Sequence, residues 1–194
     1  MNPCANVGSL PVGERSDRWA TPQEEADPYI REFDLKIDAC AEDWNTKLPY
    51  YISPEMDSLK TDWIEHAHRL GVKPHYWMNP EYINLYEWMS KAWKESQRGC
   101  LVVCLVSPNV ETPWWHTFVV PILKLIEKFL PTNGLIRFRE GRIKFKRHPD
   151  DKPVYASGKN KGKPKKDLPT KGNVYVVFLP PHMCFYKGRV FVRK

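Results

Sequence analysis

The tetrapeptide Asn79-Pro80-Glu81-Tyr82 combines residue types that could bind a planar ligand carrying an amino group. The Asn79 side-chain oxygen and the Pro80 carbonyl can both accept hydrogen bonds from one NH2 group, and the Tyr82 ring can stack on the ring that bears it. The alternative is an ordinary turn at a strand end, because short motifs also match by chance. The positions of the other polar residues in the chain help to decide between a ligand site and an ordinary turn.

Most of those candidates also fall where strands are predicted to end. Asp38 follows the alternating residues Phe33, Leu35 and Ile37, a pattern typical of a strand. In open α/β sheets, ligands bind outside the carboxyl ends of the strands, and an acid there often meets a cofactor hydroxyl or amine. A strand-ending Asp is, however, more often a turn former. The candidate ligand residues are Thr21, Asp38, Asp57, Asp62, Asn79 and Ser107.

Thr21 and Pro22 together indicate the start of a helix, with Thr21 as N-cap and Pro22 at the first helical position. The acids Glu24 and Glu25 follow in the first turn, where their negative charges interact favourably with the helix dipole. A functional interpretation adds a bound anion, such as a carboxylate, at this cap.

Strands and helices alternate along most of the chain, which predicts an α/β fold whose later strands pair antiparallel. Helices are expected at 64–70, at 83–98 and from Pro113 to 129 after a Thr112 cap, the last with a break at Pro121. Strands are expected at 33–37, 48–53, 75–78, 101–106, 135–138, 142–145 and 174–179, with a turn at 140–141 and a terminal hairpin at 185–192.

The composition fits one globular domain of 194 residues with 42 % hydrophobic content. A net charge of +7 favours a polyanionic partner, although solubility alone can explain it. Five scattered cysteines without a CxxC pair indicate reduced thiols and a cytoplasmic setting. We expect no metal site, since no Cys/His cluster has zinc spacing, and no membrane segment. The oligomeric state cannot be read from the sequence, and a monomer is assumed.

Two stretches lack the pattern of a packed core. Residues 1–17 are predicted to be a flexible lead-in, which leaves 18–194 as a single domain. Residues 147–172 are rich in Lys, Gly, Pro and Asp and predict a loop. This loop is either a solvated linker or a contact with nucleic-acid phosphates. The lysines that would make the contact are Lys159, Lys161, Lys163, Lys165 and Lys166.

Taken in order, the motifs resemble those of the phage-type DNA adenine N6-methyltransferases, the Dam family. The matching segments run from about Arg18 to Phe178. They are Arg18-Trp19-Ala20-Thr21-Pro22-Gln23, 33–41, 50–59, 61–63, Trp77-Met78-Asn79-Pro80-Glu81-Tyr82, Glu111-Thr112-Pro113-Trp114-Trp115-His116, 137–138 and 141–145. Each segment is a weak signal alone, but their order and spacing are fairly specific.

The resemblance implies a Rossmann-like fold that uses S-adenosylmethionine, with a mixed sheet and helices on both faces. It implies that Thr21 and Pro22 hold the methionine part of the cofactor and that Asp38 lines its pocket. Asp57 would bind the ribose and Asp62 the adenine amine of the cofactor. Asn79, Pro80 and Tyr82 would receive an adenine extruded from double-stranded DNA.

The third position of the catalytic motif departs from the family pattern, which is Asn-Pro-Pro-Tyr. Glu81 stands there and adds negative charge near DNA, while Asn79, Pro80 and Tyr82 are kept. Three alternatives therefore remain open: cytosine N4 methylation, an inactive methyltransferase-like DNA-binding protein, and methylation of RNA or a small molecule. The target sequence cannot be read from the chain.

Overall fold

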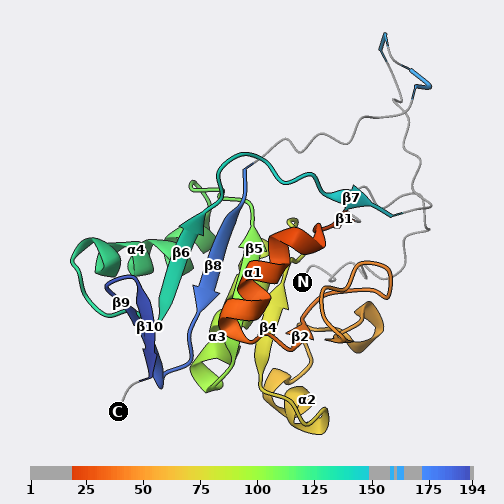
Figure 1. Ribbon diagram of the computed structural model, residues 1–194. Helices are drawn as coiled ribbons and strands as arrows, with labels where there is room; N and C mark the ends of the chain where they lie inside the picture. The colour runs from red at the N-terminus through yellow and green to blue at the C-terminus, as the bar shows by residue number, and fades with distance from the viewer. Residues whose placement is uncertain (1–18, 149–157, 160, 164–171, 193–194) are drawn as a thin grey trace, which may run out of the picture.

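A six-stranded mixed sheet with strand order β3-β2-β4-β5-β8-β6 forms the centre of the protein (Figure 1). The structure, a computed structural model, describes residues 19–148, 158–159, 161–163 and 172–192. Strands β3, β2, β4 and β5 are parallel, whereas β8 lies antiparallel to both β5 and β6. The strands are β2 (Ile37–Asp38), β3 (Tyr50–Tyr51), β4 (His75–Met78), β5 (Leu101–Val106), β6 (Gly134–Phe138) and β8 (Val174–Phe178).

Helices cover both faces of this sheet, because successive strand residues point to opposite sides. Tyr76 and Met78 of β4 face the layer formed by α2 (Trp63–Arg69), α3 (Leu85–Arg98), the π-helical turn η3 (Trp115–Val119) and α4 (Val120–Glu127). Trp77, between them, belongs to the core on the other face together with residues of α1 (Gln23–Phe33). Figure 1 shows α1 lying across that face of the sheet. The predicted α/β class, with a mixed sheet and helices on both faces, is confirmed.

The two most apolar runs of the chain form the central strands. Every residue of β5 and of β8 is buried, as expected for strands that are covered on both faces. The helix predictions also hold closely. Gly71, at φ 67°, follows α2, and Gly99, at φ 126°, caps α3, since both positions need a backbone that other residues rarely adopt.

The helix after Thr112 begins as predicted at Pro113, with the Thr112 carbonyl accepting the first hydrogen bonds from Trp115 and His116. The predicted break lies at the junction of the π-helical η3 and α4, one residue before Pro121, which occupies the first turn of α4. Proline has no amide to donate, and the π-helical turn directly before it lets the helix continue past this position.

Two strand predictions were wrong. The stretch 33–37 is not a strand, because α1 continues to Phe33 and ends at Asp34, whose left-handed backbone turns the chain into β2. Phe33 and Leu35 both face the α1 core, and this produced the alternating pattern. The stretch 142–145 forms no hairpin with β6, which pairs with β8 instead.

Shorter elements complete the described chain. Strand β1 (Trp19–Ala20) pairs antiparallel with β7 (Lys146–Arg147) and so joins the start of the described chain to the segment after β6. The predicted terminal hairpin is present as β9 (Met183–Tyr186) and β10 (Arg189–Val192). A 3-10 turn, η2 (Pro54–Met56), precedes α2.

Some predictions concern residues that the structure does not describe. The lead-in 1–17 lies outside the described residues, as do Lys165 and Lys166 and much of 147–172. Among the described helices, none is long and apolar enough to cross a membrane.

Candidate active site at the carboxyl ends of the parallel strands

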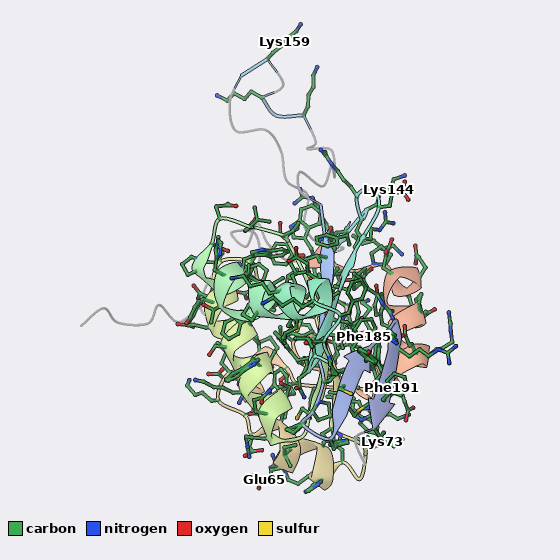
Figure 2. All side chains as sticks on the ribbon, turned by 90° about the vertical axis from the view of Figure 1, so that its left-hand side faces the viewer. Glu65, Lys73, Lys144, Lys159, Phe185 and Phe191 are labelled. Atoms are coloured by element: carbon green, nitrogen blue, oxygen red, sulfur yellow. The ribbon has the colours of Figure 1, made fainter. Side chains whose placement is uncertain are left out.

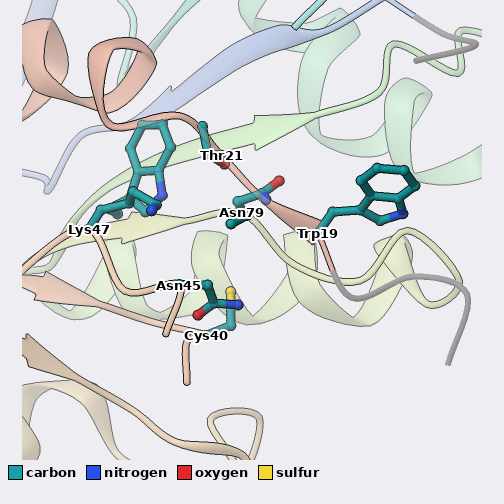
Figure 3. Close-up of a pocket in the computed structure, with 8 residues that line it drawn as sticks. Trp19, Thr21, Cys40, Asn45, Lys47 and Asn79 are labelled. Carbon is teal, nitrogen blue, oxygen red and sulfur yellow. The ribbon is translucent and has the colours of Figure 1, made fainter. Parts of the chain in front are cut away.

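The corners that follow β2 and β4 lie side by side, because the two strands are parallel neighbours with Asp38 opposite Trp77. The Ala39 amide extends the pairing by donating to the Trp77 carbonyl at 2.7 Å. A small pocket opens next to this junction. It is lined by Trp19, Ala20, Thr21, Cys40, Asn45, Lys47, Trp77 and Asn79 (Figure 3).

Asp38 is 3 % exposed and lies beneath this pocket, although it does not line it. Its Oδ1 accepts a hydrogen bond from the Cys40 amide at 3.3 Å, and its Oδ2 accepts one from the Lys47 amide at 3.0 Å. Burial raises the pKa of the carboxyl to about 6, against the opposing effect of these two amides. Asp38 therefore holds both ends of the loop that supplies Cys40, Asn45 and Lys47.

Thr21 lies beside Asn79 at the pocket (Figure 3). The predicted cap was wrong by one residue: Pro22 is the N-cap, α1 begins at Gln23, and no side chain caps the helix. Thr21 thus stays in the extended segment after β1, and its hydroxyl turns inward. Thr21 is 2 % exposed, and its Oγ1 has no hydrogen-bond partner among the described residues. A buried hydroxyl without a partner is costly, and a polar ligand would satisfy it.

Asn79 follows β4 directly and brings its amide to the pocket, while Pro80 ends the strand and is buried. Within the described chain, Asn79 Oδ1 has one hydrogen-bond donor, the Tyr82 hydroxyl at 3.5 Å. The Pro80 carbonyl receives no hydrogen bond from that part of the protein. Two acceptors at one corner are therefore available to an amine.

Tyr82 lies in the turn between β4 and α3 and is 36 % exposed, but its hydroxyl end points inward. The hydroxyl lies between two amides, because it also accepts a hydrogen bond from Asn173 Nδ2 at 3.0 Å. Burial of this end raises the pKa of the phenol. Sequence reasoning missed Asn173, a single amide between a lysine-rich stretch and an apolar strand, which carried no signal.

Cys40, Asn45 and Lys47 are further pocket residues that sequence reasoning did not select as ligands. They belong to the loop after β2, which has no recognisable motif. Burial raises the pKa of the Cys40 thiol well above its usual value, with the nearby Asp38 charge adding to the effect. Burial also lowers the pKa of Lys47. Cys40 is thus a neutral group in the pocket.

Asp57, Asp62 and Ser107 lie outside this pocket. Asp57 forms an ion pair with Lys60. Asp62 caps α2 by accepting from the Glu65 amide at 3.0 Å, and its other oxygen pairs with Arg98 at 2.6 Å. Each partner lowers the pKa of its aspartate. The cofactor roles of Asp57 and Asp62 stay predictions, and a ligand would compete with these partners.

The lysine-rich stretch returns to the sheet beside this site. Its first end is β7, which pairs with the pocket strand β1, and Arg147 stacks over the Trp19 ring at 4.1 Å. Its last end is Asn173, which contacts Tyr82. Figure 2 shows Lys144 and Lys159 at one end of the molecule and Glu65 and Lys73 at the opposite end.

The residues around the pocket fit a ligand with polar groups and a flat ring. The Thr21 hydroxyl, which has no partner among the described residues, offers a hydrogen bond, the Asn45 amide lies at the same opening, and the half-buried Trp19 indole supplies apolar surface. S-adenosylmethionine has polar groups and a flat ring of this kind.

Comparison with known proteins matches this chain to DNA N-6-adenine-methyltransferases. The family model described as DNA N-6-adenine-methyltransferase (Dam) matches residues 8–183. A protein named DNA N-6-adenine-methyltransferase from Haemophilus phage HP1 is 34 % identical over 108 residues, which is 53 % of this chain. The chain spans 57 % of that relative's length.

Proposed function

Since the chain belongs to the Dam family of DNA N-6-adenine-methyltransferases, we propose that it transfers a methyl group from S-adenosylmethionine to the exocyclic N6 of an adenine in double-stranded DNA. One observation carries the proposal: Asn79, with its acceptor oxygen, shares a pocket with Thr21, whose buried hydroxyl has no partner in the described chain. A base and a cofactor would thus meet at this opening.

The role of Asn79 and Pro80 follows from the electronic structure of the amine. The lone pair of an adenine NH2 group is shared with the ring, so the nitrogen is a poor nucleophile. The Asn79 side-chain oxygen and the Pro80 carbonyl would accept hydrogen bonds from its two N–H groups. These hydrogen bonds would favour a pyramidal nitrogen. Fixed acceptors that face a developing positive charge stabilise the transition state. Neither residue needs to form a covalent bond.

An adenine inside a duplex cannot reach this corner, so it must first be extruded. Tyr82 lies in the turn that the base would pass, with more than a third of its surface exposed. We assign it to stacking on the extruded ring, an interaction that needs no particular base.

The cofactor would lie against the loop after β2. When bound, S-adenosylmethionine supplies an electrophilic methyl group. Thr21 and Pro22 would hold its methionine part, and Asp38 would keep the loop of Cys40 and Lys47 in place beneath it. Asp57 and Asp62 remain candidates for its ribose and adenine, at the cost of their present ion pairs.

The DNA would approach the end of the molecule where Lys159 lies (Figure 2). Lys161 and Lys163 follow it closely, and Lys165 and Lys166, outside the described residues, continue the charge. Such clusters bind phosphates without regard to sequence. We place the protein in the cytoplasm of a bacterial or phage-infected cell, where its substrate would be.

The decisive experiment incubates the protein with methyl-labelled S-adenosylmethionine and unmethylated duplex DNA and identifies the labelled nucleoside by mass spectrometry. The proposal predicts N6-methyladenine. Labelled N4-methylcytosine would instead support the alternative of cytosine N4 methylation. Cofactor binding without any labelled nucleoside would favour the inactive DNA-binding protein, and label in RNA alone would contradict a DNA substrate.

A further inference from the structure

Asn173 is a buried amide in a place where packing alone does not call for one. It is 4 % exposed and precedes β8, whose five residues are all apolar or aromatic and buried. Its side-chain Oδ1 has no hydrogen-bond partner among the described residues. An amide with an unsatisfied buried oxygen costs stability, whereas a leucine, which has the same branched shape and no polar atoms, leaves no buried polar group unsatisfied.

Among the described residues, the one side-chain partner of Asn173 belongs to the candidate active site. Its Nδ2 donates to the Tyr82 hydroxyl at 3.0 Å, across 91 positions of sequence. The backbone of Asn173 is held independently, because its carbonyl accepts from the Arg139 amide at 3.3 Å. The side chain can therefore be changed without removing the backbone contact that places it.

The Tyr82 ring is more than a third exposed, and its hydroxyl has two hydrogen-bond partners among the described residues. It lies in a turn with exposed neighbours, and Ile83 next to it is 75 % exposed. Its hydroxyl reaches Asn79 Oδ1 only at 3.5 Å, a longer hydrogen bond than that with Asn173. The contact with Asn173 thus ties an exposed ring to the rigid central sheet.

We propose that Asn173 is a positioning residue that fixes the Tyr82 ring beside Asn79 before a base arrives, an inference that rests on the proposed function. A stacking ring that is already oriented loses less freedom when the base binds, and this favours capture. The amide is maintained at a cost to stability because it serves the ring. Asn173 itself touches neither the reacting amine nor the methyl group.

A double-mutant cycle between Asn173→Leu and Tyr82→Phe tests this role. Base capture is measured by a fluorescent adenine analogue at the methylated position, and single-turnover transfer is measured at saturating DNA. Each variant should weaken base capture about threefold to tenfold, the usual effect of one hydrogen bond. The double variant should be no weaker than Tyr82→Phe alone, since both substitutions remove the hydrogen bond between Asn173 and Tyr82.

The thermal midpoint separates positioning from a structural role. Asn173→Leu should unfold at the wild-type temperature or above it while its base capture falls. Additive losses in the double variant would overturn the proposal. Unchanged capture in Tyr82→Phe would overturn it even if Asn173→Leu failed to fold. A wild-type protein that neither extrudes a base nor transfers a methyl group would instead overturn the proposed function, and this inference with it.

Discussion

The candidate site has two halves, the proposed cofactor side and the proposed base side, and they differ in how completely their polar groups are satisfied. On the proposed cofactor side, Asp38 is buried, and both of its carboxylate oxygens accept hydrogen bonds from backbone amides. On the base side, Asn79 and Pro80 keep acceptors that the described chain barely uses, and Tyr82 and Ile83 are exposed. The difference indicates that the first half is built before any ligand arrives and that the second is completed by its substrate.

Thr21 joins the two halves. It is as buried as Asp38, but its hydroxyl has no partner among the described residues. The Pro80 carbonyl of the base side likewise receives no hydrogen bond from that part of the chain. The preformed half therefore contains one open position, and that position faces Asn79 in the same pocket. A ligand bound there would lie next to the base.

The largest expected effect belongs to the base side. Asn79→Ala should lower methyl transfer by about a hundredfold or more, because it removes one positioned acceptor of the transition state. DNA and cofactor should still bind, as measured by calorimetry, since this contact strengthens mainly in the transition state. Asn84→Ala, in the same turn and exposed, is the matched control. Wild-type turnover by Asn79→Ala would remove the catalytic assignment.

On the proposed cofactor side, burial of the Asp38 carboxyl should make the free energy of unfolding depend on pH. The folded pKa of Asp38, about 6, exceeds its ordinary value of 3.8, so folding favours the protonated carboxyl. Between these pH values the folded protein holds a proton that the unfolded chain has lost, and stability must fall as pH rises. The loss should reach about 3 kcal/mol at pH 7, relative to Asp38→Ala. Parallel pH profiles of denaturant unfolding for the two proteins would show that the Asp38 carboxyl is not destabilised by its burial.

Tyr82 should matter for capture of the base more than for chemistry. Tyr82→Ala should weaken capture by about 1–3 kcal/mol, the range for one base–aromatic stack. The fluorescence of an adenine analogue at the target position would report less extrusion. A loss confined to the transfer step, with extrusion unchanged, would instead make Tyr82 part of the chemistry.

The lysine cluster should act on all DNA sequences alike. Replacing Lys159, Lys161, Lys163, Lys165 and Lys166 by Gln should flatten the dependence of log affinity on log salt by up to about 0.9 per lost phosphate contact. Lys73→Gln, at the opposite end of the molecule, is a charge-matched control for a single position. An unchanged slope in the five-fold variant would leave this stretch as a linker.

The smallest effect is expected at Glu81. Glu81→Pro restores the family pattern, removes a negative charge near the DNA and stiffens the turn, so transfer should stay equal or rise a few-fold. Steady-state methylation of the same DNA compares the two proteins. If neither modifies any DNA tested, the inactive DNA-binding protein becomes the better account.

Sequence alone predicted the elements whose burial is uniform. The apolar runs of β5 and β8 needed no knowledge of their neighbours, because strands covered on both sides read as continuous hydrophobic stretches. The stretch 142–145 could not be resolved this way. Its Ile143 is fully buried in the α1 core, but the strand that follows pairs with β1, more than a hundred positions away in sequence.

The site shows the same division. Asn79, Pro80 and Tyr82 were found because a proline and a change from apolar to polar residues mark the strand end. Asn173 was missed because its position depends on a contact 91 positions away in sequence. Lys47 was missed because the loop that carries it, held to Asp38 through the Lys47 amide, has no motif that marks this residue. Asp57 and Asp62 were assigned their cofactor roles by resemblance. In the structure, ion pairs with Lys60 and Arg98, which no motif encodes, engage both carboxylates.

A structure of the protein with S-adenosylhomocysteine and a duplex containing its methylated site would test the central claim most directly. The account predicts an extruded adenine with its N6 about 3 Å from both Asn79 Oδ1 and the Pro80 carbonyl. The Tyr82 ring should lie against the base. An adenine that remains stacked in the duplex, or an N6 that faces away from Asn79, would contradict the account.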